Sequence, residues 1–129
     1  MEKPPSKEKF YEVINNTIQF DHLILFVIRN KNNYKVSKKT GSKTKLLIIN
    51  RILDFYGIKK PKWFDDDFLD LYKIRNQFAH NIKPQQYSNT KHMDKPSWEK
   101  LYKRHTELYN NLSHWICVEL MGSWYLRRM

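Results

Sequence analysis

Three residues whose types and spacing could do chemistry lie close together near the middle of the chain: Arg75, Asn76 and His80. An imidazole titrates near neutral pH, so it can act as a general acid or base. A guanidinium binds phosphate oxygens through a planar fork of N–H donors. Asn76 and His80 are four residues apart and share a helix face, so the amide could orient the imidazole. Together these groups could support phosphoryl transfer without a metal ion.

The same residues also admit a purely structural interpretation. Arg75 lies about 140° around a helix from His80, although its long side chain can bend back. Asn76 and His80 could instead form a buried polar cap, with Arg75 paired to a nearby aspartate. Residue types alone leave both interpretations open.

The elements that must position these residues are predicted to be helices. Apolar residues recur at intervals of three to four, strand-like alternation is weak, and the chain has only three glycines. We expect helices from Ser6 to Ile28, from near Ser42 to Gly57, after the aspartates 65–67, and from around residues 94–96. The fold class is therefore all-α, a bundle of about four to five helices in one domain spanning residues 1–129.

Several polar residues interrupt the apolar pattern without forming a metal site. Asp21 is the one charged residue on the apolar face of the first helix. We interpret His105 as a core or interface histidine and Cys117 as a small core residue. The aspartates 65–67 suit the first turn of a helix, where carboxylates favour the helix dipole. No His, Cys or acidic residues stand at metal-ligand spacing, so we predict neither a metal nor a cofactor.

The charge of the chain favours a polyanionic partner. Its 129 residues carry 24 Lys and Arg against 13 Asp and Glu, a net charge of +11. No acidic residue occurs between Asp21 and Asp54, and we expect the basic residues there to bind RNA unless they form only solvated surface. These residues are Arg29, Lys31, Lys35, Lys38, Lys39, Lys43, Lys45 and Arg51. Residues 29–45 are predicted to be a basic mobile loop and residues 82–95 a polar loop.

Composition also excludes some classes of protein. The longest apolar run has six residues, from Leu23 to Ile28, whereas a membrane-spanning helix needs about 18 or more. The charged, Pro-containing start of the chain does not resemble a signal peptide. A single cysteine excludes an internal disulfide framework. We therefore expect a cytoplasmic protein with no membrane partner.

The segment around His80 resembles two known groups of proteins. Residues 75–80 match the R-x4-H motif of HEPN domains, small α-helical domains of ribonuclease toxins, CRISPR-associated ribonucleases and abortive-infection systems. Residues 73–81 look like the signature helix of the mannitol operon repressor family, K-I-R-N-x-F-A-H. Residues 41–46 and the Leu-rich helix after them are similar to that family too, so the resemblance spans about residues 40 to 90.

The resemblance implies a specific activity. HEPN nucleases are homodimers in which two Arg–His pairs build one composite site, and they cleave RNA without a metal by attack of the 2′-hydroxyl. Carried onto this chain, His80 would be the general acid or base and Arg75 would hold the scissile phosphate. Asn76 would orient His80. The implied partners are RNA and a second copy of the chain.

Two features point to alternatives. HEPN toxins controlled by a nucleotidyltransferase antitoxin carry a tyrosine two places after the histidine, where this chain has Ile82. Modification of that tyrosine therefore cannot silence this protein, and any antitoxin or regulatory protein must act differently. Members of the mannitol repressor family are described as regulators, so a non-catalytic regulator acting through protein or nucleic-acid contacts is the alternative function. No convincing helix-turn-helix for reading DNA bases is present.

Replacing Lys35, Lys38, Lys39 and Lys43 with Gln tests the basic stretch. Each phosphate neutralised on single-stranded RNA adds about 0.7 to the slope of log affinity against log salt. We expect the four substitutions together to flatten that slope by up to about 3 units, measured by RNA titration at several salt concentrations. An unchanged slope would mean that the stretch is solvated surface.

Overall fold

A computed structural model of the chain describes residues 5–31, 36, 39–80 and 97–122. Four α-helices and a short π-helix make up the described part, and no strand lies within it. They are α1 (Lys7–Lys31), α2 (Ser42–Tyr56), α3 (Phe64–His80), α4 (Trp98–Trp115) and η2 (Ile116–Leu120). The predicted all-α bundle is confirmed. None of these helices combines the length and apolar character needed to cross a membrane.

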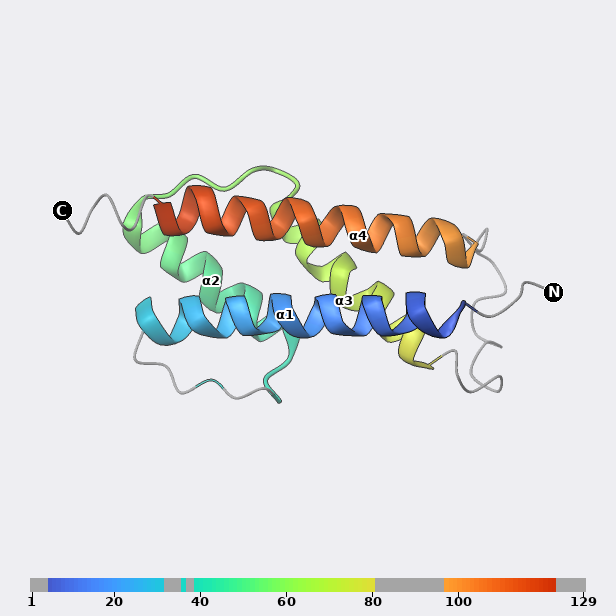
Figure 1. Ribbon diagram of the computed structural model, residues 1–129. Coiled ribbons are helices and arrows are strands. Elements are labelled where there is room, and N and C mark those ends of the chain that lie inside the picture. Colours follow the sequence, from blue (N-terminus) through green and yellow to red (C-terminus); the bar gives the residue numbers. More distant parts are fainter. Residues whose placement is uncertain (1–4, 32–35, 37–38, 81–96, 123–129) are drawn as a thin grey trace.

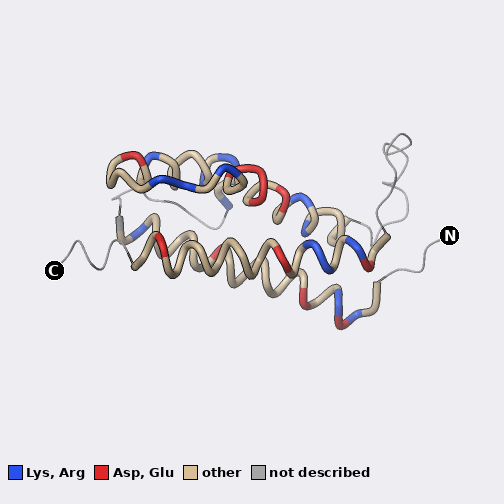
Figure 2. The backbone as a smooth tube through the Cα atoms, turned by 90° about the horizontal axis from the view of Figure 1, so that it is seen from above, with Lys and Arg blue, Asp and Glu red and all other residues tan. Residues whose placement is uncertain are grey.

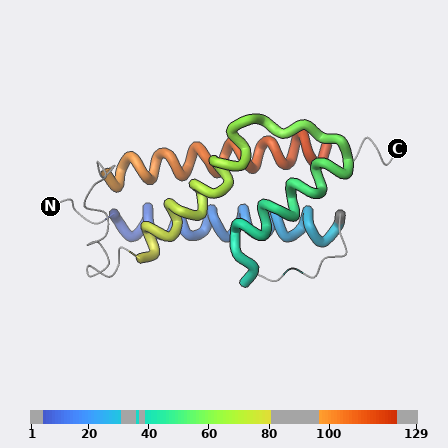
Figure 3. The backbone as a smooth tube through the Cα atoms, turned by 180° about the vertical axis from the view of Figure 1, so that it is seen from behind, coloured from blue at the N-terminus to red at the C-terminus, as the bar shows by residue number. Residues whose placement is uncertain are grey.

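The bundle has two layers. The helices α1 and α4 lie side by side and run in the same direction, and α2 and α3 cross them obliquely from one side (Figures 1 and 3). Contacts along their lengths agree with this direction: Lys9 pairs with Glu99 near the helix starts, and Thr17 bonds His105 further on. Figure 1 also shows that the last turns of α3 lie at the same end of the molecule as the start of α1.

The helix ends follow the sequence signals closely. The hydroxyl of Ser6 accepts from the Lys9 N–H at 3.3 Å, and Ser97 caps α4 in the same way at 3.2 Å. Gly57 ends α2 with φ at 65°, the left-handed conformation that glycine adopts at low cost. Its N–H bonds the Asp54 carbonyl, which satisfies one of the free carbonyls of the last turn.

Three predicted boundaries need correction. The helix α3 begins at Phe64, before the aspartates 65–67 and not after them, and these carboxylates lie in its first turn as expected. Residues 29–31 belong to α1 and residues 42–45 to α2, so the predicted loop 29–45 is helical at both ends. The helix α4 begins at Trp98, after its cap Ser97, and not around residues 94–96. The predicted polar loop 82–95 lies outside the described residues.

Large aromatic residues join three of the helices in the core. Phe20 of α1 lies 5.5 Å from Phe68 of α3, measured between ring centroids, and Phe64 lies 4.8 Å from Trp115 of α4. All are buried. Burial of such side chains is the main stabilising contribution to a bundle of this size.

Cys117 is exposed, so the prediction that it belongs to the core is wrong. It lies in η2, directly after the buried Ile116. The buried residues Leu112, Ile116 and Leu120 are four positions apart, a spacing that leaves Cys117 off the inward face.

His105 is a fully buried histidine of α4, in agreement with its predicted place in the core. The hydroxyl of Thr17 donates to the Val13 carbonyl at 2.9 Å, so it can only accept from His105 Nε2–H, at 2.8 Å. Within the described residues, Nδ1 has no hydrogen-bond partner. A proton on Nδ1 would be a buried, unpaired donor, and burial accordingly lowers the pKa of His105 to about 4.

This histidine makes stability depend on pH. Its pKa is lower in the folded chain than in the unfolded chain, so the unfolded state binds the extra proton first as pH falls. The contribution of neutral His105 is fully present above about pH 6.5 and is lost progressively toward pH 4, on the order of 3 kcal/mol in total.

We therefore expect the unfolding free energy to fall between pH 6.5 and pH 4, measured by urea denaturation. His105→Leu removes the titrating group, so the variant should lose this part of the pH dependence. Parallel pH profiles for the two proteins would contradict the interpretation.

Candidate functional site

The three residues of the R-x4-H motif lie in the last two turns of α3. Asn76 and His80 are exposed, and Arg75 is half buried. The Nη1 of Arg75 donates to Asn76 Oδ1 at 3.0 Å, whereas the nearby Asp70 pairs with Arg104. The interpretation of Asn76 and His80 as a buried polar cap, with Arg75 paired to an aspartate, therefore does not hold.

The hydrogen bond between Arg75 and Asn76 joins the side chains of two neighbouring motif residues. Without it, the two side chains would point in directions about 100° apart around the helix. The bond directs the guanidinium toward the solvent face of α3, where Asn76 and His80 lie. Asn76 holds Arg75 in this arrangement, and its predicted role in orienting His80 stays a prediction.

Lys73 belongs to the same exposed face of α3. It stands three residues before Asn76 and seven before His80, a spacing that puts the three side chains on one side of a helix. All three are exposed. Sequence reasoning missed Lys73 as a site residue, although its seven-residue spacing from His80 was a signal that could have found it. The face thus offers a primary amine, a guanidinium, an amide and an imidazole to a ligand from solvent.

A partly buried carboxylate fixes the helix that carries this face. Asp21 of α1 accepts hydrogen bonds on one oxygen, Oδ1, from Lys45 Nζ at 2.6 Å and from the Tyr72 hydroxyl at 2.8 Å. Burial and the negative charge of Asp21 raise the pKa of Tyr72, so the phenol stays protonated and donates. Tyr72 precedes Asn76 by one turn. Its bond to α1 therefore sets the rotation of α3 and the direction in which Asn76 and His80 point.

The basic residues predicted to bind RNA are not gathered into one patch with the motif. Arg29, Lys43 and Arg51 are exposed on α1 and α2, and Arg29 also donates to the Val36 carbonyl at 3.3 Å. Figure 2 shows basic positions spread over several helices. Lys39 is exposed as well, whereas Lys35, Lys38 and the side chain of Lys31 lie outside the described residues.

Lys45 requires a correction. Its side chain is 3% exposed and ion-paired with Asp21, so it belongs to the interior and not to the surface that could contact RNA. A count of charges along the sequence could not separate it from its exposed neighbours.

The aspartates at the start of α3 are engaged by neighbouring side chains. Asp65 accepts from Asn50 at 3.2 Å and from Lys60 at 2.7 Å, which joins α2 and the connection after it to α3. Across the described residues, no three His, Cys, Asp or Glu side chains gather where they could hold a metal ion. The described side chains at the α3 end can support acid–base and electrostatic chemistry.

Comparison with known proteins adds no further assignment: no family model, curated protein or solved structure matches the chain.

Substitutions at Asp21 test whether this carboxylate holds the bundle together. Asp21→Asn leaves Lys45 buried without a countercharge, so we expect a loss of about 3–5 kcal/mol in unfolding free energy. Tyr72→Phe removes one hydrogen bond to a charged group and should cost about 1.5–3 kcal/mol. Urea denaturation measures both.

The double variant Asp21→Asn, Lys45→Met is the control, because it removes the unpaired charge and should recover much of the loss. If Asp21→Asn alone were as stable as the wild type, the ion pair would not contribute to the fold.

Proposed function

We propose that the chain is a metal-independent endoribonuclease whose active site is the exposed face at the end of α3. The observation that carries this proposal is that Asn76 and His80 lie open to solvent, with Arg75 tethered to Asn76 at 3.0 Å. A buried polar cap would have concealed these groups from any substrate. Their types suit phosphodiester chemistry, and the chain's net charge of +11 suits a polyanion.

In the proposed reaction, a general base takes the proton of an RNA 2′-hydroxyl, and the 2′-oxygen attacks the adjacent phosphorus. The bond from phosphorus to the 5′-oxygen breaks, and a general acid protonates that oxygen. The products are a 2′,3′-cyclic phosphate and a 5′-hydroxyl. The reaction needs no oxidant or external nucleophile.

Each motif residue takes one role in this scheme. His80 transfers a proton, and Arg75 binds the scissile phosphate and stabilises the charge that develops in the transition state. Asn76 positions these groups. Lys73, on the same face, is placed to bind a neighbouring phosphate of the strand. One chain supplies one motif imidazole, so a second copy would supply the partner for the other proton transfer in a composite site.

A regulator without catalytic activity is the second candidate function. The observation in its favour is an exposed apolar stripe on α1, formed by Tyr11, Ile18 and Phe26. Exposed apolar surface of this kind is typical of protein-binding sites. This candidate predicts binding to a protein partner and no cleavage of RNA.

Cleavage of labelled RNA by single variants separates the two candidates. His80→Ala should lower the cleavage rate by about 100- to 10,000-fold while RNA affinity stays nearly unchanged, because the variant lacks a positioned proton-transfer group. Arg75→Ala should weaken both cleavage and binding, since it removes a charge-assisted phosphate contact. Products should form equally well in EDTA and end in 2′,3′-cyclic phosphate.

His114→Ala is the matched control, because His114 is an exposed histidine on α4 outside the motif. It should cleave like the wild type. A wild-type protein that cleaves no RNA pool, or a His80→Ala variant as active as His114→Ala, would overturn the nuclease proposal.

A further inference from the structure

The outer face of α1 carries a long apolar stripe without a covering element among the described residues. Tyr11, Ile18 and Phe26 are 65%, 46% and 48% exposed. They are spaced by seven and eight residues, close to two helical turns each, so they lie on one side of the helix. The core contacts of α1 lie on the other side, through residues such as Phe20 and Ile24. Much of the stripe's apolar surface is therefore left uncovered by the described part of the chain.

The charges at the two ends of this stripe are opposite. The exposed Glu8 stands at one end and the exposed Arg29 at the other, about 32 Å apart along the helix. Arg29 gives one N–H to the Val36 carbonyl and retains further donors. In a parallel pairing with another α1, like charges would meet at both ends. In an antiparallel pairing, each glutamate would meet an arginine, so the charges select the antiparallel arrangement.

The residues between these ends complement each other in the same antiparallel arrangement. A two-fold axis between Ile18 and Gln19 places Glu8 opposite Arg29 of a second copy. The same axis places Tyr11 opposite Phe26, and Asn15 opposite His22, an amide facing an imidazole. One register thus matches charged, aromatic and polar positions simultaneously, and Ile18 lies at the centre. Such self-complementarity is what a two-fold interface between identical chains requires.

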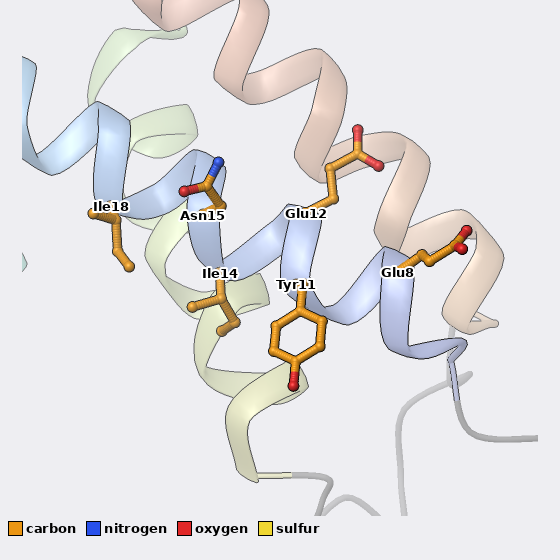
Figure 4. A pocket seen from close by; sticks show the side chains of 6 residues that line it. All are labelled: Glu8, Tyr11, Glu12, Ile14, Asn15 and Ile18. Carbon is orange, nitrogen blue, oxygen red and sulfur yellow. The ribbon is translucent and has the colours of Figure 1, made fainter.

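The surface where the opposing aromatic residue would arrive is open and partly apolar. It lies along the first half of α1, beside the end of α3 (Figure 4). It is lined by Glu8, Tyr11, Glu12, Ile14, Asn15 and Ile18. Phe26 of a second copy would pack against Tyr11 and Ile14 there. Aromatic side chains at the centre of a contact often contribute most of the binding energy of a protein interface.

We propose that the outer face of α1 binds a second copy of this chain as an antiparallel helix pair, with Phe26 of each copy packed against Tyr11 and Ile14 of the other. This contact is separate from the active site proposed above and goes beyond it. The end of α3 lies beside the first half of α1, so antiparallel pairing leaves the two α3 ends at opposite ends of the pair. A composite site at α3 is a second contact with its own determinants.

Sedimentation across a concentration series tests the proposal with the whole chain. The wild type should self-associate, and Phe26→Glu should weaken the association by about tenfold or more, because it removes the aromatic anchor. Phe55→Glu is the control, since Phe55 is 82% exposed but lies on α2. Circular dichroism establishes that each variant is folded. His80→Ala should associate like the wild type, so loss of RNA cleavage and loss of this contact are distinguishable.

A charge swap tests the antiparallel register. Glu8→Arg alone and Arg29→Glu alone each place like charges opposite each other and should weaken association, whereas the double variant restores the pairing. A monomeric wild type would overturn the proposal and leave the stripe to a different partner. Association unaffected by Phe26→Glu, or a double variant no better than the single ones, would overturn it too.

Discussion

The bundle depends on one partly buried carboxylate that joins three helices. Asp21 of α1 uses a single oxygen to hold the ammonium of Lys45 from α2 and the hydroxyl of Tyr72 from α3. A buried lysine is tolerated only when its charge is compensated, so Lys45 could not occupy its 3% exposed position without Asp21. The apolar contacts around it have no comparable directionality. They stabilise the packed state, and Asp21 selects which faces of the helices meet.

The bond between Asp21 and Tyr72 also determines how the exposed face of α3 is oriented. A residue on a helix has a fixed angular relation to residues three and four places away, so a bond made by Tyr72 also determines where Asn76 points one turn later. The aromatic contact between Phe20 and Phe68, at 5.5 Å, holds the preceding turn of α3 against the same part of α1. The polar groups at the end of α3 therefore continue a stripe of the helix whose preceding residues, Phe68 and Tyr72, are anchored against α1. A helix that is fixed in this way holds its exposed side chains at defined positions.

The sequence predicted the helices well because their ends and apolar faces depend on local chemistry. Ser6, Ser97 and Gly57 act through hydrogen bonds within a few residues, which the neighbouring sequence largely determines. The position of Asp21 on an apolar face also marked it as exceptional. Its partner could not be deduced, because Lys45 is 24 residues away and resembles its exposed neighbours in every local property.

The candidate site was predictable in composition but not in arrangement. Spacing identified Arg75, Asn76 and His80, and it left open whether they were buried. Their exposure depends on how α3 is rotated, a tertiary property set by Tyr72 and the core. The bond from Arg75 to Asn76 involves a long side chain with many rotamers, so sequence spacing could not specify it. The exposed Cys117, by contrast, could have been placed from spacing, because the buried Leu112, Ile116 and Leu120 recur every four residues and leave position 117 outside.

An open site of this kind needs a further component for efficient catalysis. His80 and Asn76 face water, where electrostatic interactions are weak compared with those in an enclosed site. Stabilising a charged phosphorane-like transition state requires donors that are fixed in place and shielded from solvent. The isolated chain fixes Arg75 through Asn76 but provides no wall over the motif among its described residues. In the proposed nuclease, bound RNA or a second α3 would supply such a wall, and we therefore expect its catalytic geometry to depend on an assembly.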